Sequence, residues 1–325
     1  MHSLPDAVKE LIRRNKRPLI TWFEIEGFVR RLYRERVFDG ERLLIKSSFP
    51  SARSLSALRT TLLDPTYGDD RLRGSESWED QLERRAATEG ERLLIADRDF
   101  SSSVWRVAGI PDESPEALCC AIDPWCYVSH LSAMQQWGLT NRNPRALQLT
   151  RPSKLLWRQR AKDEAKEACG QLEPGDPGQQ PRERVTFPPV LRKRDLAVFE
   201  PGYFGRSVDI PDSHARIATV GQTFRDMLHE PALCGGMSHV LEVWDDHAAT
   251  YLDEIIEALN APELKTTKIA FVRAGYILSE RLQVQDARVD AWAQFAERGG
   301  SRKLDPEKPF EPQFSERWML SLNVS

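Results

Sequence analysis

The apolar positions near the front of the chain repeat with the period of an α-helix. Over residues 22–36 they are spaced i, i+3, i+4 and i+7, which places them on one helical face. These apolar residues are Ile25, Phe28, Val29 and Leu32. Arg30, Arg31 and Arg34 fall outside the stripe. The segment is therefore predicted to be an amphipathic helix whose arginines point away from its apolar face.

A second helix is predicted after Pro50, because Ser51 is a suitable N-cap and leucines then recur at helical spacing. At 100° per residue these leucines cluster on one side of the helix. They are Leu55, Leu58 and Leu62. The other side and its flank carry Arg53, Ser56, Arg59 and Thr60. The leucine stripe is expected to hold the helix against a core and leave a basic, hydroxyl-bearing face open.

Two β-prone runs follow, at residues 92–96 and 104–107, separated by a polar stretch. This pattern predicts a hairpin, with Arg98 in its loop and Arg106 on its second strand. A short strand at residues 42–46 and a further helix at residues 78–88 are also expected. Helices followed by an arginine-bearing hairpin are typical of a winged helix-turn-helix, in which one helix enters the major groove of DNA and the wing contacts the flanking backbone.

The rest of the chain predicts a second, larger domain. Residues 110–115 are rich in Pro, Asp, Glu and Ser and mark a boundary, so the expected division is 1–110 and 111–325. In the second part we expect a short buried helix ended by Gly138, a strand at residues 147–150 and one long helix over residues 237–259. Residues 169–189 are dense in Pro and Gly and are expected to form an exposed loop. The predicted fold class is α+β, with a winged helix-turn-helix followed by a mixed α/β domain.

The net charge of −3 conceals a basic front and an acidic remainder. Residues 9–59 hold 13 Lys and Arg against 6 Asp and Glu, whereas the rest of the chain holds 33 against 43. Attraction to phosphate depends on such local charge, which favours a nucleic-acid-binding front domain; an ordinary solvated surface is the alternative. The odd number of cysteines, the absence of long apolar runs and the lack of a secretory signal predict a cytoplasmic protein without membrane contact.

Catalytic and metal-binding motifs are scarce. The sequence has no phosphate-binding glycine loop and no nucleophile elbow. Cys126 and His130 are spaced as neighbours on a helix, but no second ligand pair accompanies them, and the acids and histidine of residues 245–247 point in different directions. We therefore expect no enzyme activity, no metal and no cofactor.

Several phrases in the second part occur in an order that resembles a known family. They are Tyr127–Met134, Trp137–Thr140, Leu147–Pro152, Ile217–Val220, Thr223–Leu228, Gly235–Gly236 and Arg273–Leu278. Together they resemble the AbiEi antitoxin family, which belongs to the type IV toxin–antitoxin systems of abortive infection. The resemblance covers about half of the chain. At the front, the chain departs from the family's short winged helix by an additional helix and strand.

The resemblance implies a phage-defence antitoxin and transcriptional repressor. Its winged helix would repress its own operon by binding an inverted repeat in double-stranded promoter DNA as a homodimer or cooperative pair. The larger domain would counteract a nucleotidyltransferase-like toxin, with no direct complex required. The residues it suggests for this domain are Tyr127, Ser129, His130, Arg273 and Tyr276. A purely structural interpretation of His130, as a histidine at the core edge that hydrogen-bonds the backbone, stands beside the functional one.

The residues expected to contact DNA are those of the second helix and the hairpin. They are Arg53, Ser56, Arg59, Thr60, Arg98 and Arg106. Arginine can read guanine bidentately or bridge to phosphate, while serine and threonine hydroxyls usually fix register on the backbone. Two alternatives remain open from the sequence: a phage-defence enzyme such as a metal-dependent nuclease, and a DNA-binding scaffold without a toxin partner.

Overall fold

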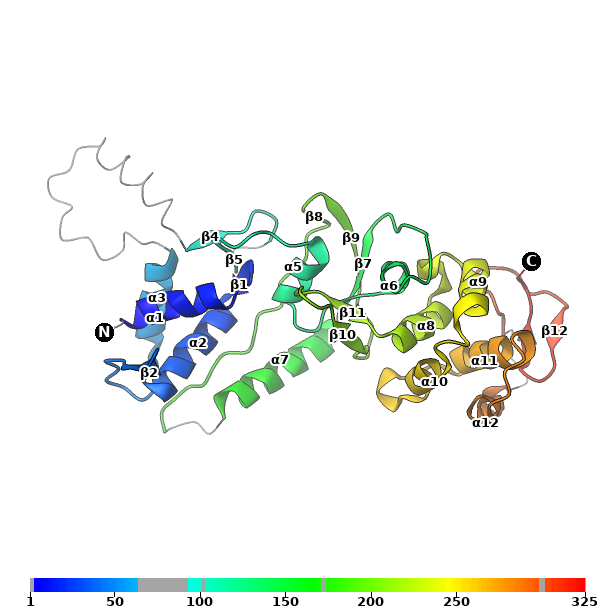
Figure 1. Cartoon of the computed structure of the whole chain (residues 1–325). Helices are drawn as coiled ribbons and strands as arrows, with labels where there is room; N and C mark the ends of the chain where they lie inside the picture. The colour runs from blue at the N-terminus through cyan, green and yellow to red at the C-terminus, as the bar shows by residue number, and fades with distance from the viewer. Residues whose placement is uncertain (1–2, 64–92, 101–102, 171–173, 298–301, 325) are drawn as a thin grey trace. The chain divides into compact units, whose positions relative to one another are not determined.

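The computed structural model describes residues 3–63, 93–100, 103–170, 174–297 and 302–324. Helices and several sheets make it a mixed α and β structure (Figure 1). The chain divides into two compact units. The first consists of Met1–Pro124 and Trp157–Pro188, and the second of Trp125–Leu156 and Pro189–Ser325. The chain thus passes between the units three times, and the boundary expected at residues 110–115 lies inside the first unit.

The first unit begins with helices and small antiparallel sheets. In chain order its first elements are α1 (Leu4–Arg14), β1 (Leu19–Thr21), α2 (Trp22–Glu35), β2 (Val37–Phe38), β3 (Glu41–Arg42), α3 (Ala52–Leu63), β4 (Leu94–Ala96), β5 (Val104–Val107) and α5 (Pro115–Ile122). Strands β1, β5 and β4 form a three-stranded sheet in that order, with both pairs antiparallel. Strands β2 and β3 pair as a separate short hairpin. Within the two expected runs, residues 94–96 and 104–107 therefore pair as a hairpin, as predicted, while residue 92 lies outside the described residues.

Helix α2 forms where the sequence predicts it. Thr21 and Glu24 make a reciprocal capping box at its start, in which the Glu24 carboxylate accepts from the Thr21 backbone N–H at 2.8 Å. Arg36, in the left-handed conformation, ends it. The apolar stripe is buried apart from Phe28, which is half-buried. This face packs into the core of the first unit.

Helix α3 is held by its leucines. Leu58 and Leu62 are buried in the same core as α1 and α2, and Leu55 is half-buried against it. The prediction of a strand over residues 42–46 is wrong in its length, because only Arg42 of this run pairs, as part of β3. Asp39 and Gly40, both at positive φ, form the turn of a hairpin whose strands are two residues long. The helix expected at residues 78–88 lies outside the described residues.

The remaining part of the first unit is helix α7 (Lys154–Cys169), which enters it at Trp157, and the segment that follows. Residues 174–188 form a loop without helix or strand. The sequence predicted an exposed loop here. The structure differs, because Gln179, Arg182 and Val185 are buried. The Gln179 side-chain amide donates to the Phe23 carbonyl at 2.6 Å, so the loop is anchored to α2.

Arg30 shows how firmly this loop is attached. Its side chain is 9% exposed and its guanidinium contacts Glu26 at 2.8 Å and Asp176 at 2.9 Å. It also donates to the Gly178 carbonyl at 2.5 Å. As predicted, Arg30 points away from the apolar stripe of α2. It is nevertheless buried in an ion cluster, because the loop around Asp176, 146 residues later in the chain, covers this surface.

The second unit is built on a six-stranded mixed sheet in the order β10, β11, β6, β7, β9, β8. The strands are β6 (Tyr127–Val128), β7 (Leu147–Thr150), β8 (Val190–Leu191), β9 (Arg194–Phe199), β10 (Ser207–Asp209) and β11 (Arg216–Ala218). Strands β7 and β9 are parallel, with Leu149 opposite Val198. The strand predicted at residues 147–150 is confirmed as β7.

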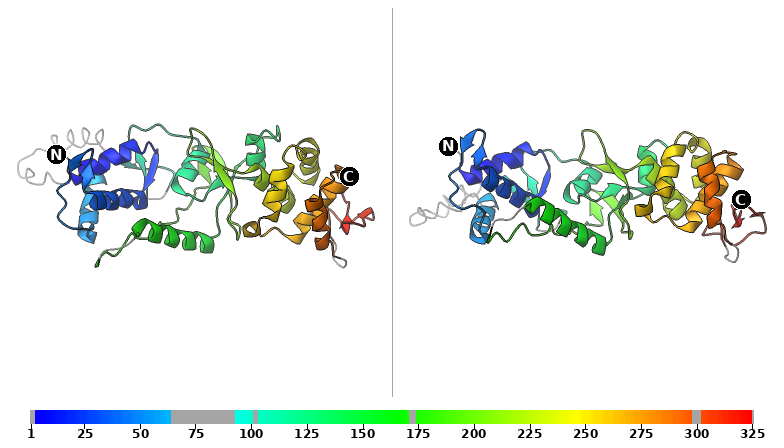
Figure 2. Two further views of the ribbon diagram at one scale, coloured as in Figure 1. Left: turned by 60° about the horizontal axis from the view of Figure 1, so that its bottom comes forward. Right: turned by 90° about the horizontal axis from the view of Figure 1, so that it is seen from below.

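Helices and a small terminal sheet complete the second unit. They are α6 (His130–Gln136), α8 (Val220–His229), α9 (Met237–His247), α10 (Leu252–Asn260), α11 (Lys268–Gly275), α12 (Ala287–Asp290), β12 (Phe314–Ser315) and β13 (Leu320–Ser321). In Figure 2 the yellow-to-orange helices lie against one another. Their core contains Phe224, Trp244 and Trp318, all fully buried. Among the helices that the structure describes, none has both the length and the apolar composition needed to cross a bilayer.

The short helix ends at Gly138 as predicted, since Gly138 adopts a φ of 69° directly after the C-cap. The long helix expected over residues 237–259 is wrong. It is interrupted between α9 and α10, where Thr250 and Tyr251 are weak helix formers and the N–H of Thr250 turns back to the His247 carbonyl. Asp253 in the first turn of α10 complements the helix dipole, and an acidic residue here is a sequence signal that a second helix begins.

Close approach of backbones fixes the packing of α8 on α10. A Cβ placed on Gly221 would lie 2.1 Å from the carbonyl oxygen of Glu254. No side chain fits in this gap, so glycine at position 221 sets the distance between the two helices.

Candidate nucleic-acid interface

The open face of α3 presents Arg53, which has no partner among the residues that the structure describes. Arg53 and Ser56 are exposed, and among the described residues Arg53 makes no hydrogen bond or ion pair. Thr60 is half-buried, and its hydroxyl donates to the Ser56 carbonyl at 3.1 Å. The Thr60 oxygen can still accept a hydrogen bond. Arg53 and Ser56 are therefore available to an external partner, whereas the proton of Thr60 is already used.

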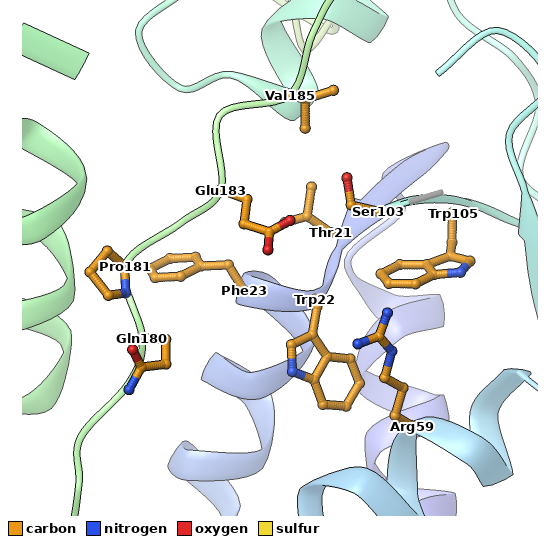
Figure 3. A pocket seen from close by; sticks show the side chains of 10 residues that line it. All are labelled: Thr21, Trp22, Phe23, Arg59, Ser103, Trp105, Gln180, Pro181, Glu183 and Val185. Atoms are coloured by element: carbon orange, nitrogen blue, oxygen red, sulfur yellow. The ribbon is translucent and has the colours of Figure 1, made fainter. Parts of the chain in front are cut away.

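Arg59, on the flank of α3, is stacked between two tryptophans. Its guanidinium carbon lies 5.5 Å from the ring centroid of Trp22 and 5.3 Å from that of Trp105, within cation–π distance of both. Figure 3 shows the guanidinium between the two indoles. Trp105 is buried at the start of β5, and Trp22 is the first residue of α2. Sequence reasoning missed both tryptophans, because their approach depends on the pairing of β1 with β5.

The arginines of the hairpin differ in how far they are engaged. The side chain of Arg98 is 69% exposed, with its Nε 3.8 Å from Asp99. The turn that contains Arg98 is stabilised by the Asp97 carboxylate, which accepts from the backbone N–H of Asp99 and of Phe100. Arg106 is more engaged, since its guanidinium donates to Asp112 at 3.4 Å. Arg98 is thus the more accessible cation of the two.

Two of the residues suggested for the second domain, Ser129 and His130, are buried together with Thr150. Ser129 lies at the centre, because its hydroxyl accepts from Thr150 at 2.8 Å and contacts Nδ1 of His130 at 2.8 Å. The His130 ring packs on Phe199 with centroids 4.7 Å apart, and burial lowers the pKa of His130 to about 4. The histidine is therefore neutral at pH 7. Its hydrogen-bond partner is a serine hydroxyl, not the backbone that the structural interpretation expected.

Arg273 and Tyr276 belong to a different part of the second unit. Arg273 is buried and donates to the Leu228 carbonyl at 2.6 Å and to the Lys303 carbonyl at 3.2 Å. Burial also lowers the pKa of Arg273 to about 10. Tyr276 is half-buried at the start of a π-helical turn. Arg273 therefore has a structural role: its hydrogen bonds connect Leu228 of α8 to Lys303 in the C-terminal segment.

Tyr127 faces a buried polar cluster that the sequence did not suggest. Arg225 is fully buried, stacks on the Tyr203 ring at 4.4 Å and donates to the Tyr203 hydroxyl at 3.0 Å. Next to it, Asp226 accepts from the Gln222 side chain at 2.7 Å. Burial raises the pKa of Asp226 to about 7 and that of Tyr203 to about 12. Burial, reinforced by Asp226, also raises the pKa of Tyr127.

The candidate metal ligands do not converge. In the described ranges no group of three or more His, Cys, Asp or Glu side chains is arranged to hold a metal ion. Cys126 is buried, and Asp245 forms an ion pair with Arg281 at 2.7 Å. Comparison of the chain with models of known protein families and with curated proteins finds no match.

Proposed function

We propose that the first unit is a winged helix-turn-helix that binds duplex DNA, with α3 as the recognition helix and the β4–β5 hairpin as the wing. The order of its elements supports this proposal. Apart from the short β2–β3 hairpin, the chain runs through α1, β1, α2, α3, β4 and β5, which is the order of helices and strands in such a module. The sheet order β1, β5, β4 places the hairpin's second strand at the centre.

The observation that carries the proposal is the two-sided character of α3. Leu58 and Leu62 fix the helix to the core, while Arg53 and Ser56 on the other side are exposed. A helix fixed in this way can enter a groove without rearranging, so that little conformational entropy is lost on binding. Arg53 then contacts a base edge or a phosphate, and Arg98 of the hairpin contacts the flanking backbone.

We further propose, from the resemblance to the AbiEi family, that the chain is a cytoplasmic antitoxin that represses its own operon. Two copies would bind an inverted repeat, since a symmetric operator matches a symmetric protein pair. The second unit would counteract a nucleotidyltransferase-like toxin. Its buried clusters around Ser129 and Asp226 support a scaffold role for most of the suggested residues.

The test is binding of the full-length protein to a labelled duplex from upstream of its own gene, measured by fluorescence anisotropy at 50 and 200 mM salt. We expect specific binding that weakens steeply with salt, because phosphate contacts release counterions. Incubation with Mg²⁺ or Mn²⁺ should leave the duplex intact. Cleavage would identify a nuclease instead, and equal affinity for an unrelated duplex would exclude a sequence-specific repressor.

The antitoxin proposal needs a separate test. Co-expression with a nucleotidyltransferase-like protein encoded beside this chain should restore the growth that the neighbour alone prevents. Growth that remains arrested would leave a DNA-binding protein without antitoxin activity.

A further inference from the structure

The stacked Arg59 forms one wall of a pocket in the first unit. The pocket has a volume of about 130 Å³ and combines aromatic, hydroxyl, amide and charged side chains. Its lining consists of Thr21, Trp22, Phe23, Arg59, Ser103, Trp105, Gln180, Pro181, Glu183 and Val185 (Figure 3). The lining comes from β1, α2, α3, the β4–β5 hairpin and the partly buried loop 174–188, all of which belong to one compact unit.

The guanidinium of Arg59 has hydrogen-bond donors that an anion can use. Trp22 and Trp105 interact with it through their ring faces, so neither indole uses the N–H donors of the guanidinium as a hydrogen-bond acceptor would. Among the described residues no carboxylate or carbonyl accepts from these donors. Arg59 is exposed, but its two cation–π contacts restrict the side chain, so it binds a carboxylate or phosphate at lower entropic cost than a fully solvated arginine does.

The size of the pocket limits what can enter. A cavity of about 150 Å³ holds one benzene, so a pocket of about 130 Å³ has room for at most one six-membered ring, and the rest of a ligand stays at the mouth. Trp22 and Phe23 offer aromatic surfaces on which a planar ring can stack. Arg59 can then bind an anionic group attached to that ring.

We infer that this pocket binds a small anion with a single planar six-membered ring, either a pyrimidine nucleotide or an aromatic carboxylate. Because Arg59 also flanks the DNA-facing side of α3, an anion bound in the pocket would place a negative charge beside the DNA phosphates and disfavour DNA binding. The site would thus make the proposed repressor responsive to a ligand. This consequence rests on the proposed function, whereas the binding itself does not.

Glu183 sets a limit on the charge of the ligand. Its carboxylate also lines the pocket, and its side chain is exposed. A carboxylate near the bound anion disfavours it, and more strongly so for a dianion. Removal of this charge should therefore tighten binding of each anionic ligand.

The experiment is isothermal titration of the full-length protein, without DNA, using two pairs of probes. Benzoate is compared with neutral benzamide, and uridine monophosphate with neutral uridine. We expect saturable binding of at least one anion, at least tenfold tighter than its neutral counterpart. Comparison of the two pairs distinguishes the aromatic carboxylate from the nucleotide. No saturable binding of either anion at millimolar concentration, or equal affinity for a neutral counterpart, would overturn the inference.

Variants identify the pocket. Arg59→Ala should weaken binding of the anion about tenfold or more, whereas Arg53→Ala, on the open face of α3, should leave it unchanged. Trp22→Phe keeps an aromatic wall and should bind, whereas Trp22→Ala should not; thermal unfolding checks that both fold. Glu183→Gln should tighten binding about two- to fivefold. Anion binding that survives Arg59→Ala and Trp22→Ala would place the ligand elsewhere and refute the site.

DNA binding separates the two proposals. Addition of the anion should release wild-type protein from the labelled duplex, and the Arg59→Ala variant should be insensitive to it. If the anion binds but no duplex is bound in its absence, the pocket stands and the proposed function fails. If duplex binding is unaffected by a bound anion, the regulatory consequence is wrong.

Discussion

Replacement of Asp226 by asparagine should make the stability of the second unit less dependent on pH. The Asp226 carboxyl is 3% exposed, and burial raises its pKa from 3.8 to about 7. Its oxygen accepts from Gln222, and an asparagine carbonyl can accept the same hydrogen bond. Asp226→Asn therefore removes the titration with little change of shape.

The direction follows from proton linkage. Between pH 3.8 and 7 the folded state holds a proton on Asp226 that the unfolded state has lost, so this group makes the free energy of unfolding fall as pH rises. From these two pKa values the loss between pH 5 and pH 8 is about 3 kcal/mol. His130 and His229, whose pKa values are lowered to about 4 and about 3, act in the opposite direction below pH 6.5. Their effect cancels when variant and wild type are compared at the same pH.

The assay is hydrogen exchange of peptides from α8 as a function of urea at pH 5 and pH 8, which reports on the unfolding of this part of the chain. Relative to wild type, the free energy of unfolding of the variant should be about 3 kcal/mol higher at pH 8 than at pH 5, so the variant is relatively more stable at the higher pH. Asp253→Asn, at a carboxylate that is 80% exposed, is the matched control and should show no such difference. A relative stability of Asp226→Asn that is equal at the two pH values would refute the reasoning.

Two further substitutions test the packing. Gly221→Ala should destabilise the second unit by roughly 1–3 kcal/mol, since its Cβ would meet the Glu254 carbonyl oxygen, whereas Gly202→Ala has nothing within 4 Å and should be neutral in urea unfolding. Asp176→Ala should cost about 3 kcal/mol and increase hydrogen exchange in residues 174–188, because it leaves Arg30 buried with one carboxylate fewer. The exposed Arg14–Asp39 pair is its control, and Asp39→Asn, which tolerates the positive φ of this turn residue, should cost less than about 1 kcal/mol. Equal effects in either pair would contradict the packing described above.

Local patterns were sufficient to predict much of the first unit and parts of the second. The stripe from Ile25 to Leu32 predicted α2, and β-prone composition predicted the β4–β5 hairpin, because both signals come from residues close in sequence. The break after α9 was overlooked because Val240 and Leu259 are both apolar and buried, so the apolar pattern runs on across the turn.

Features that depend on distant segments could not be predicted. The burial of Arg30 requires the loop near Asp176, and the stacking of Arg59 requires Trp22 and Trp105 to meet through the β1–β5 pairing. The α3 face was recognisable in the sequence, since the exposure of Arg53 and the burial of Leu58 both follow from helical spacing. Which of its arginines is free, however, is decided by tertiary contacts.

The most direct test of the account is the affinity of Arg53→Ala for the upstream duplex, measured by fluorescence anisotropy beside wild type and Arg13→Ala. Arg13 lies on α1, and its side chain is 58% exposed. If Arg53 reads a base, its loss should weaken specific binding by about 1–3 kcal/mol, roughly 5- to 150-fold, and relax the preference at one position of the site. Arg13→Ala should change the affinity less than about twofold. Equal affinities of the two variants for the duplex would contradict α3 as the reading helix.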